Sequence, residues 1–185
     1  MNSRRHALAI SMLMAAVPTV VIAAGDAANL PGGASSVVEA HGDWTTRCGA
    51  AGKSDTAPGG VQCAVTQQQL DQKTHQRILT LAVNPMSSGG VKGVLIMPFG
   101  LALDSGVTLK IDNGPETKPL RFKTCLPAGC LVPLEWPDAT VKDLRNAKVL
   151  TITAQSDRGG AAPFAVSLNG FGGAFDRAIE LTPKQ

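Results

Sequence analysis

The chain has 185 residues, of which 44% are hydrophobic and 17% charged, and its formal net charge at pH 7 is +3. This length and composition suit one globular domain with its own hydrophobic core. A net charge this small, together with no Tyr and only 4% aromatic residues, excludes a strongly basic nucleic-acid surface and an aromatic platform for stacked bases. We therefore expect no nucleic-acid partner.

The N-terminus has the layout of a secretory signal peptide. Arg4 and Arg5 precede residues 7–24, which are free of charge and end in small side chains. We predict a signal peptide over 1–24, with cleavage after Ala27 as the alternative, and a periplasmic, cell-surface or secreted location. The competing interpretation is an uncleaved membrane anchor, because the apolar stretch approaches the roughly 20 residues that span a bilayer. The arginine pair also admits a twin-arginine export route.

The next segment is predicted to lead into a single domain. Residues 25–38 are rich in Ala, Gly and Ser without periodicity, so we expect a flexible lead-in there and the domain over 39–185. Residues 41–48 predict the first strand, with Trp44 as its largest apolar side chain. A buried indole N–H needs a hydrogen-bond partner. A polar loop is expected over 49–60.

Short apolar segments between turn residues predict most of the remaining structure. The strand over 76–84 is apolar on both faces, which indicates the middle of a sandwich. A turn at Asn113-Gly114-Pro115 ends the strand before it. Pro133 places its own strand at a sheet edge, because proline lacks a backbone N–H. The further strands are predicted over 61–69, 91–97, 107–112, 120–125, 131–136, 148–155 and around 164–168.

Two segments have helical periodicity instead. Residues 138–147 place apolar side chains at helical spacing and begin with Asp138, which can cap a helix. Residues 170–181 carry a helical stripe that we expect to lie across one end of the sheets. The stripe consists of Phe171, Phe175, Ala178 and Ile179. The predicted fold class is all-β: a β-sandwich of roughly eight to ten short antiparallel strands, with one short helix and a C-terminal helix.

The four cysteines are expected to form structural disulfides. They are Cys48, Cys63, Cys125 and Cys130. Disulfides persist in exported proteins, and four cysteines can pair in three ways; the spacing favours the two local pairs. A bridge that closes a fifteen-residue loop contributes roughly 3 kcal/mol. The absence of a C-x-x-C motif argues against a zinc site and against a thiol redox centre.

No catalytic or metal-binding constellation is evident. The histidines are His6, His41 and His75, and no Gly-x-Ser-x-Gly motif is present. Serine and cysteine hydrolases need a nucleophile, a base and a group that orients the base. The aspartates Asp43, Asp104 and Asp112 lack the close spacing of a calcium loop, so turn roles are favoured. We expect no catalytic residue, no metal and no cofactor.

One group of basic side chains is a candidate binding surface. It consists of Lys110, Lys118, Arg121 and Lys123, around a predicted hairpin. Such a group could attract an anionic surface, such as lipid head groups or a glycan.

Several short motifs between Gly42 and Phe171 occur together. They are Gly42-Asp43-Trp44 with Cys48, Cys63 with Gln67-Gln68, Met97-Pro98-Phe99-Gly100-Leu101, Gly106-Val107 with Ile111-Asp112, residues 122–125 ahead of Gly129-Cys130, and Val166-Ser167-Leu168-Asn169-Gly170-Phe171. In this combination the chain resembles the invasion-associated locus B family of exported proteins, which usually has Lys where Asn169 stands. The resemblance implies a small β-sandwich protein of the periplasm or outer surface, associated in its founding member with invasion of host red cells. It implies no catalytic residues.

Three functions follow as hypotheses. The first is an exported, non-enzymatic cell-envelope protein that binds a protein, a glycan or an envelope component, with peripheral contact to a membrane surface, in support of host-cell interaction or invasion. The second is a periplasmic hydrolase or thiol-dependent enzyme with an unrecognised site. The third is an envelope stress or assembly factor that acts through the basic group at 110–123.

Overall fold

The computed structural model describes residues 30–52 and 60–182. The expected signal peptide over 1–24, the start of the expected lead-in and residues 53–59 of the expected loop lie outside these residues. Within the two described ranges, no helix is both long and apolar enough to cross a bilayer.

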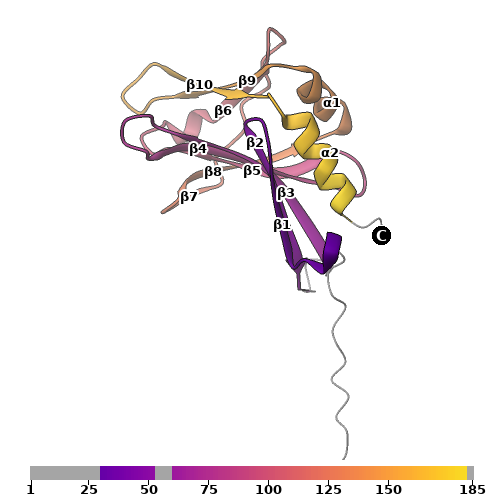
Figure 1. Ribbon diagram of the computed structural model, residues 1–185. Coiled ribbons are helices and arrows are strands. Elements are labelled where there is room, and N and C mark those ends of the chain that lie inside the picture. Colours follow the sequence, from indigo (N-terminus) through magenta and orange to yellow (C-terminus); the bar gives the residue numbers. More distant parts are fainter. Residues whose placement is uncertain (1–29, 53–59, 183–185) are drawn as a thin grey trace, which may run out of the picture.

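The described residues form two antiparallel sheets and two helices (Figure 1). The strand order is β1-β2-β3-β4-β5-β8-β7 in the large sheet and β10-β9-β6 in the small one. The large sheet contains β1 (Ser36–His41), β2 (Trp44–Ala51), β3 (Gly60–Leu70), β4 (Arg77–Pro85), β5 (Val91–Met97), β7 (Thr124–Leu126) and β8 (Gly129–Trp136). The small sheet contains β6 (Val107–Ile111), β9 (Val149–Gln155) and β10 (Ala161–Ser167). The helices are α1 (Asp138–Asn146) and α2 (Phe171–Leu181), with short 3-10 turns η1 (Pro31–Gly33) and η2 (Leu103–Ser105). The all-β sandwich with one short helix and a C-terminal helix is thus confirmed.

The core lies between one face of the large sheet and the elements that cover it. Alternate side chains of β3 are buried from Val61 to Gln67, as the period of two along a strand requires. The small sheet covers part of this face and α2 covers the part formed by β1, β2 and β3 (Figure 1). β4 is the central strand of the large sheet, as predicted, although only one of its faces is fully buried.

Helix α2 forms where predicted but presents a different stripe. Its buried side chains are Phe171, Ala174, Phe175, Ala178 and Leu181. Ile179 is 45% exposed, so its inclusion in the stripe was wrong. At about 100° per residue, Ile179 is rotated away from the buried side on which Ala174 and Leu181 lie. The helix packs along β1 to β4 rather than across one end of the sheets.

Three local expectations need correction. Strand β1 begins at Ser36, inside the expected flexible lead-in over 25–38, because it pairs with β2 along its whole length. Of the strand expected over 120–125, only a bridge at Leu120 and the three-residue β7 form. Asp138 makes no capping hydrogen bond in α1, where Pro137 is the N-cap residue.

Pro133 was expected to mark an edge strand, yet β8 lies between β5 and β7. Strand β7 pairs with β8 only as far as Leu131. Beyond that residue β8 has β5 on one side alone, so Pro133 occupies a locally free edge that does not need its missing N–H.

Candidate functional site

Two of the sequence motifs meet in space and form an interior support. Trp44 donates its indole N–H to the carbonyl of Ser167 at 2.9 Å, and its ring meets that of Phe171 edge to face at 4.9 Å. The expected partner for the buried indole is therefore present. Gly42 and Gly170 lie close to the opposite backbone, since an added Cβ would stand 2.7 Å from the Asn169 carbonyl and 1.9 Å from the His41 carbonyl. These motifs serve packing.

Two glutamines of β3 support the edge of the small sheet. Gln67 donates to the Ser167 carbonyl at 2.8 Å and Gln69 to the Ala165 carbonyl, so both satisfy acceptors on β10. The side-chain amide oxygen of Gln67 is buried without a hydrogen-bond partner in the described structure. Asp43 accepts a hydrogen bond from the Ser167 hydroxyl at 2.7 Å, which links the β1–β2 turn to β10.

The disulfides join cysteines that face each other on neighbouring strands. Cys48 bonds to Cys63 across β2 and β3, with Cα atoms 4.1 Å apart. Cys125 bonds to Cys130 across β7 and β8, with Cα atoms 3.9 Å apart. These are the two local pairings that the spacing favoured. No cysteine is free, so neither pair offers a thiol nucleophile.

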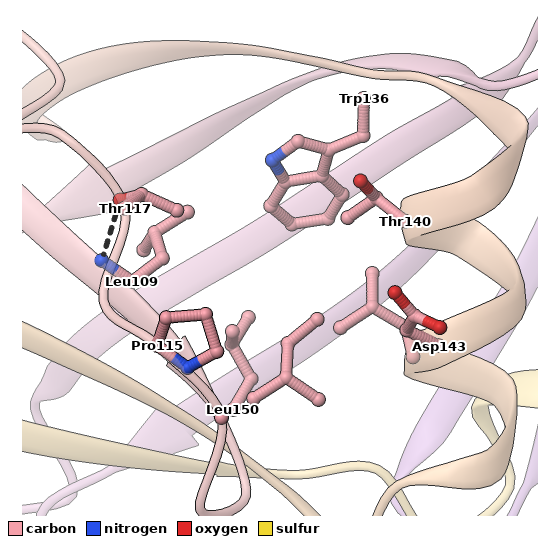
Figure 2. Close-up of a pocket in the computed structure, with 10 residues that line it drawn as sticks. Leu109, Pro115, Thr117, Trp136, Thr140, Asp143 and Leu150 are labelled. Carbon is pink, nitrogen blue, oxygen red and sulfur yellow. Dashed lines mark hydrogen bonds between the residues drawn. The ribbon is translucent and has the colours of Figure 1, made fainter.

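An apolar pocket opens where β6, β9, α1 and the end of β8 meet. Its volume is about 330 Å³, within the range of small-molecule sites. It is lined by Leu109, Ile111, Gly114, Pro115, Thr117, Trp136, Thr140, Asp143, Leu144 and Leu150. Figure 2 shows Leu109, Pro115 and Leu150 on one side, with Thr140 and Asp143 reaching from α1 on the other. This pocket is the candidate functional site.

The loop after β6 builds one wall of the pocket by folding back on its own strand. Gly114 donates its N–H to the Ile111 carbonyl, and Thr117 exchanges hydrogen bonds with the backbone of Leu109 at 2.8 and 3.0 Å. Asp112 has a positive φ of 45°, and its carboxylate accepts the N–H of Val149 at 2.9 Å. The loop is therefore fastened to both β6 and β9.

The pocket combines apolar walls with a few polar side-chain groups. Its polar side-chain groups are the hydroxyls of Thr117 and Thr140, the indole N–H of Trp136 and the carboxylate of Asp143 (Figure 2). The Thr117 hydroxyl already accepts the N–H of Leu109. None of these polar groups is a nucleophile paired with a base. The arrangement suits an apolar group that carries a hydrogen-bond donor or a cation near Asp143.

The predicted basic residues lie along one segment rather than in one compact group. Lys118, Arg121 and Lys123 are exposed on the crossover from β6 to β7, and Lys110 lies on β6, where its backbone pairs with that of Glu116. In the described ranges, none of the four cations makes an ion pair. Lys110 stands between the pocket residues Leu109 and Ile111, whereas Lys123 lies beside β7, where its N–H donates to the Leu131 carbonyl.

The two described histidines are far from any catalytic pattern. His75 is exposed in the β3–β4 turn. The Nε2 atom of His41 is buried without a hydrogen bond, 3.7 Å from the Glu39 carboxylate. Among residues 30–52 and 60–182, no three His, Cys, Asp or Glu side chains gather as a metal site requires.

One ion pair perturbs the protonation of its partners. Arg177 of α2 donates two hydrogen bonds to Glu39 of β1, at 2.7 and 3.0 Å. The guanidinium holds the pKa of Glu39 below its ordinary value and the carboxylate raises the pKa of Arg177. Because the pair joins the helix to the edge strand, it is structural.

The sequence did not reveal the pocket. Its turn at Asn113-Gly114-Pro115 was recognised, but only as the end of a strand. Leu109 and Trp136 fall within the strands predicted over 107–112 and 131–136, and their apolar character did not point to a cavity, since the wall of a cavity and a packed core use the same apolar side chains. The pocket forms because a gap remains between this turn and α1. The separation of these two elements is a feature of the tertiary structure that no local sequence pattern encodes.

The fold and pocket define a small, disulfide-bonded β-sandwich protein with an apolar surface pocket. Comparison with known proteins gives the family. The model of the Invasion associated locus B (IalB) protein family matches residues 44–178, more than half of the chain. The chain belongs to this family.

Named relatives and a solved structure agree. An Invasion protein B homolog of Brucella abortus (strain 2308) is 42% identical over 159 residues, covering 84% of this chain and 87% of the relative. Invasion protein B of Bartonella bacilliformis is 30% identical over 157 residues, covering 83% and 81%. The crystal structure of invasion associated protein b from Bartonella henselae matches with a TM-score of 0.69 and 28% identity, covering 78% of this chain and 96% of that one.

Asn169, the position at which the resemblance implied Lys, is exposed. Only its backbone carbonyl takes part in the contact with Asp43, whose N–H it accepts at 3.1 Å. The departure therefore leaves the interior support intact.

Proposed function

We propose that this chain is an exported, non-enzymatic protein of the cell envelope that binds a partner and holds an apolar group of that partner in the pocket. The pocket carries the proposal, because it is a surface cavity of about 330 Å³ whose lining is mostly apolar. Export is supported by the two disulfides, which persist in oxidising compartments, and by the layout of residues 1–24.

The test is to fill the pocket and measure binding of a fluorescent apolar probe, anilinonaphthalene sulfonate. Thr140→Phe places a ring in the cavity from α1. Ala139→Phe adds the same ring at the neighbouring exposed position and is the matched control. We expect Thr140→Phe to weaken probe binding at least about tenfold, because the ring occupies the space in which the probe would make its apolar contacts. Ala139→Phe should leave probe binding unchanged. Equal binding by both variants would contradict the proposal.

The probe also tests the role of Asp143. Since the probe is an anion, the Asp143 carboxylate should repel it. Asp143→Asn is therefore expected to strengthen probe binding, most clearly at low ionic strength, where exposed charges are least screened. An unchanged affinity in this variant at low ionic strength would show that the probe binds elsewhere.

The absence of catalysis is tested separately. The purified protein is assayed against a panel of esters, glycosides and disulfides, and we expect no turnover. Turnover that survives purification to homogeneity would favour the alternative, a periplasmic hydrolase or thiol-dependent enzyme.

The relatives' names support a finer proposal. Because relatives from Brucella and Bartonella are named Invasion protein B or its homolog, we extend the partner-binding role to host-cell interaction. Labelled protein should bind host cells, and the Thr140→Phe variant should bind them less than Ala139→Phe does. Binding that is equal in both variants would separate the host-cell role from the pocket.

Among the four predicted basic residues, Lys110 and Lys118 are the sequence neighbours of pocket residues, and we propose these two as a second contact for the same envelope partner. Charge reversal at Lys110 and Lys118 tests this without touching the other end of the molecule. If this variant captures the same envelope partners as the parent protein, Lys110 and Lys118 do not contact the partner. The same result would contradict an assembly or stress role that depends on these two residues.

A further inference from the structure

The end of the sandwich away from α1 exposes an unusual share of apolar side chains. Six large apolar residues are strongly exposed in the described structure: Val38, Leu70, Phe99, Leu103, Leu126 and Ile179. Four of them belong to turns at this one end. They are Leu70 at 50%, Phe99 at 62%, Leu103 at 43% and Leu126 at 50% exposure. We call this set the apolar tip. Scattered single exposures are ordinary, whereas a concentration of them marks an interaction surface.

Strand pairing, a side-chain hydrogen bond and a disulfide connect the turns of the large sheet at this end. Leu70 and Arg77 pair where β3 meets β4, and the Arg77 guanidinium donates to the Ala128 carbonyl in the β7–β8 turn. Leu126 belongs to that turn and pairs with Gly129. The disulfide between Cys125 and Cys130 closes the same turn, so Leu126 stands on a covalently fixed support.

The segment that carries Phe99 and Leu103 joins this end to the small sheet. It follows Met97, which pairs with Cys130. Leu101 pairs with Ser156, and the Gly100 carbonyl accepts the N–H of Asp157 in the β9–β10 turn. Figure 1 shows the β3–β4, β7–β8 and β9–β10 turns on the same side of the molecule, away from α1.

Basic side chains surround the apolar tip. The exposed cations on these turns and on residues 121–123 of the adjoining crossover are Lys73, Arg77, Arg121, Lys123 and Arg158, and the carboxylates on the same residues are Asp71, Asp104 and Asp157. Asp71 is occupied within its own turn, where the N–H groups of Thr74 and Lys73 donate to it at 2.8 and 3.0 Å and lower its pKa. Cations therefore outnumber carboxylates, five to three.

We propose that the apolar tip docks on an anionic lipid bilayer, with Phe99 and Leu126 entering the interface and Arg121 and Lys123 contacting the head groups. Peripheral proteins bind membranes through apolar side chains that enter the interface, assisted by cations near anionic lipids. The four apolar side chains stand on separate turns, which a fluid bilayer accepts one by one. A protein partner would need a matching rigid surface. A second copy is disfavoured, because two basic rims would face each other.

The docking does not depend on the pocket, so each can fail without the other. The full chain is expressed with export, and intact mass establishes that residues 1–24 have been removed, because that apolar segment would bind lipid by itself. Sedimentation then measures binding to vesicles of phosphatidylcholine with and without phosphatidylglycerol. We expect binding only to the anionic vesicles, weakened by salt.

Matched variants locate the surface. Phe99→Ser with Leu126→Ser should weaken vesicle binding at least about tenfold, and Arg121→Glu with Lys123→Glu should abolish the preference for anionic lipid. Val38→Ser with Ile179→Ser is the control, because these side chains are similarly exposed, at 54% and 45%, but lie on β1 and α2. Retained binding by the first pair, or an equal loss in the control, would overturn the proposal. No binding by the parent protein would also overturn it and would leave a protein as the occupant of the tip.

Discussion

The two ends of the sandwich use apolar side chains in opposite ways. At the end near α1, Leu109, Trp136 and Leu150 are turned inward around a concave pocket. At the other end, Phe99 and Leu126 are turned outward on turns. The interior between the ends is packed and supported by Trp44, its bond to Ser167 and its contact with Phe171.

The concave end is suited to holding a small ligand, whereas the end with exposed apolar side chains is suited to contacting an external surface. A cavity binds a group small enough to enter it, and its walls must stay packed for the protein to fold. Exposed turns contribute little to folding and are free to meet something outside the molecule. The predictions below test whether stability and binding divide between the two ends in this way.

The largest difference is expected between two leucines, one from each end. Leu144 of α1 is 1% exposed and lines the pocket, whereas Leu126 at the tip is 50% exposed. Leu144→Ala should lower the free energy of unfolding by about 2–5 kcal/mol, because it leaves a cavity. Leu126→Ala should change it by less than about 0.5 kcal/mol. Urea denaturation of both variants measures this, and similar losses would deny the contrast.

The two disulfides should also differ in how much they stabilise the fold, with the disulfide at the tip contributing less. The difference should be smaller than that between the two leucines. Cys48 and Cys63 are separated by 15 residues in sequence, and Cys125 and Cys130 by 5. The loop-entropy model gives about 3 kcal/mol for the first bridge and about 2 kcal/mol for the second. Replacing each pair by alanines and comparing the free energies of unfolding tests the order. If replacing Cys125 and Cys130 lowers the free energy of unfolding more than replacing Cys48 and Cys63 does, the β7–β8 turn contributes more to stability than the loop-entropy model predicts.

The smallest effect concerns the ion pair between Glu39 and Arg177, which belongs to neither end. Because the folded pKa of Glu39 lies below the ordinary value of 4.5, its charge stabilises the fold above that pH, and the stabilisation is lost as the pH falls through the lower folded pKa. Glu39→Gln should therefore lower Tm at neutral pH and have no effect in strong acid.

Glu135→Gln is the control for this experiment, since Glu135 is exposed and makes no ion pair within the described ranges. A Tm difference for Glu39→Gln that does not depend on pH would assign its effect to packing rather than to charge.

The fold could be predicted where a local pattern is sufficient. Alternation along β4, β6 and β9, the apolar run of β5 and the helical spacing of α1 and α2 predicted these strands and helices within a few residues. Ile179 was misplaced because the spacing alone does not tell which side of a broad stripe faces the sheet. Strand β1 was missed because its pairing with β2, rather than its composition, makes it a strand.

The sites could not be predicted to the same extent. The pocket joins Leu109, Trp136 and Leu144, and the tip joins Leu70, Phe99 and Leu126, each from separate elements. Their apolar side chains gave no local indication of whether they would be buried, line a cavity or face solvent. The basic residues at 118–123 were found, but their division between the two ends depends on the crossover that carries them.

The most direct test compares both binding activities in the same set of proteins. Binding of anilinonaphthalene sulfonate and binding of vesicles with phosphatidylglycerol are measured for the parent chain, for Thr140→Phe, and for Phe99→Ser with Leu126→Ser. We predict that Thr140→Phe loses only the probe and that the tip variant loses only the vesicles. If either variant loses both activities while keeping the Tm of the parent, the two ends do not act separately.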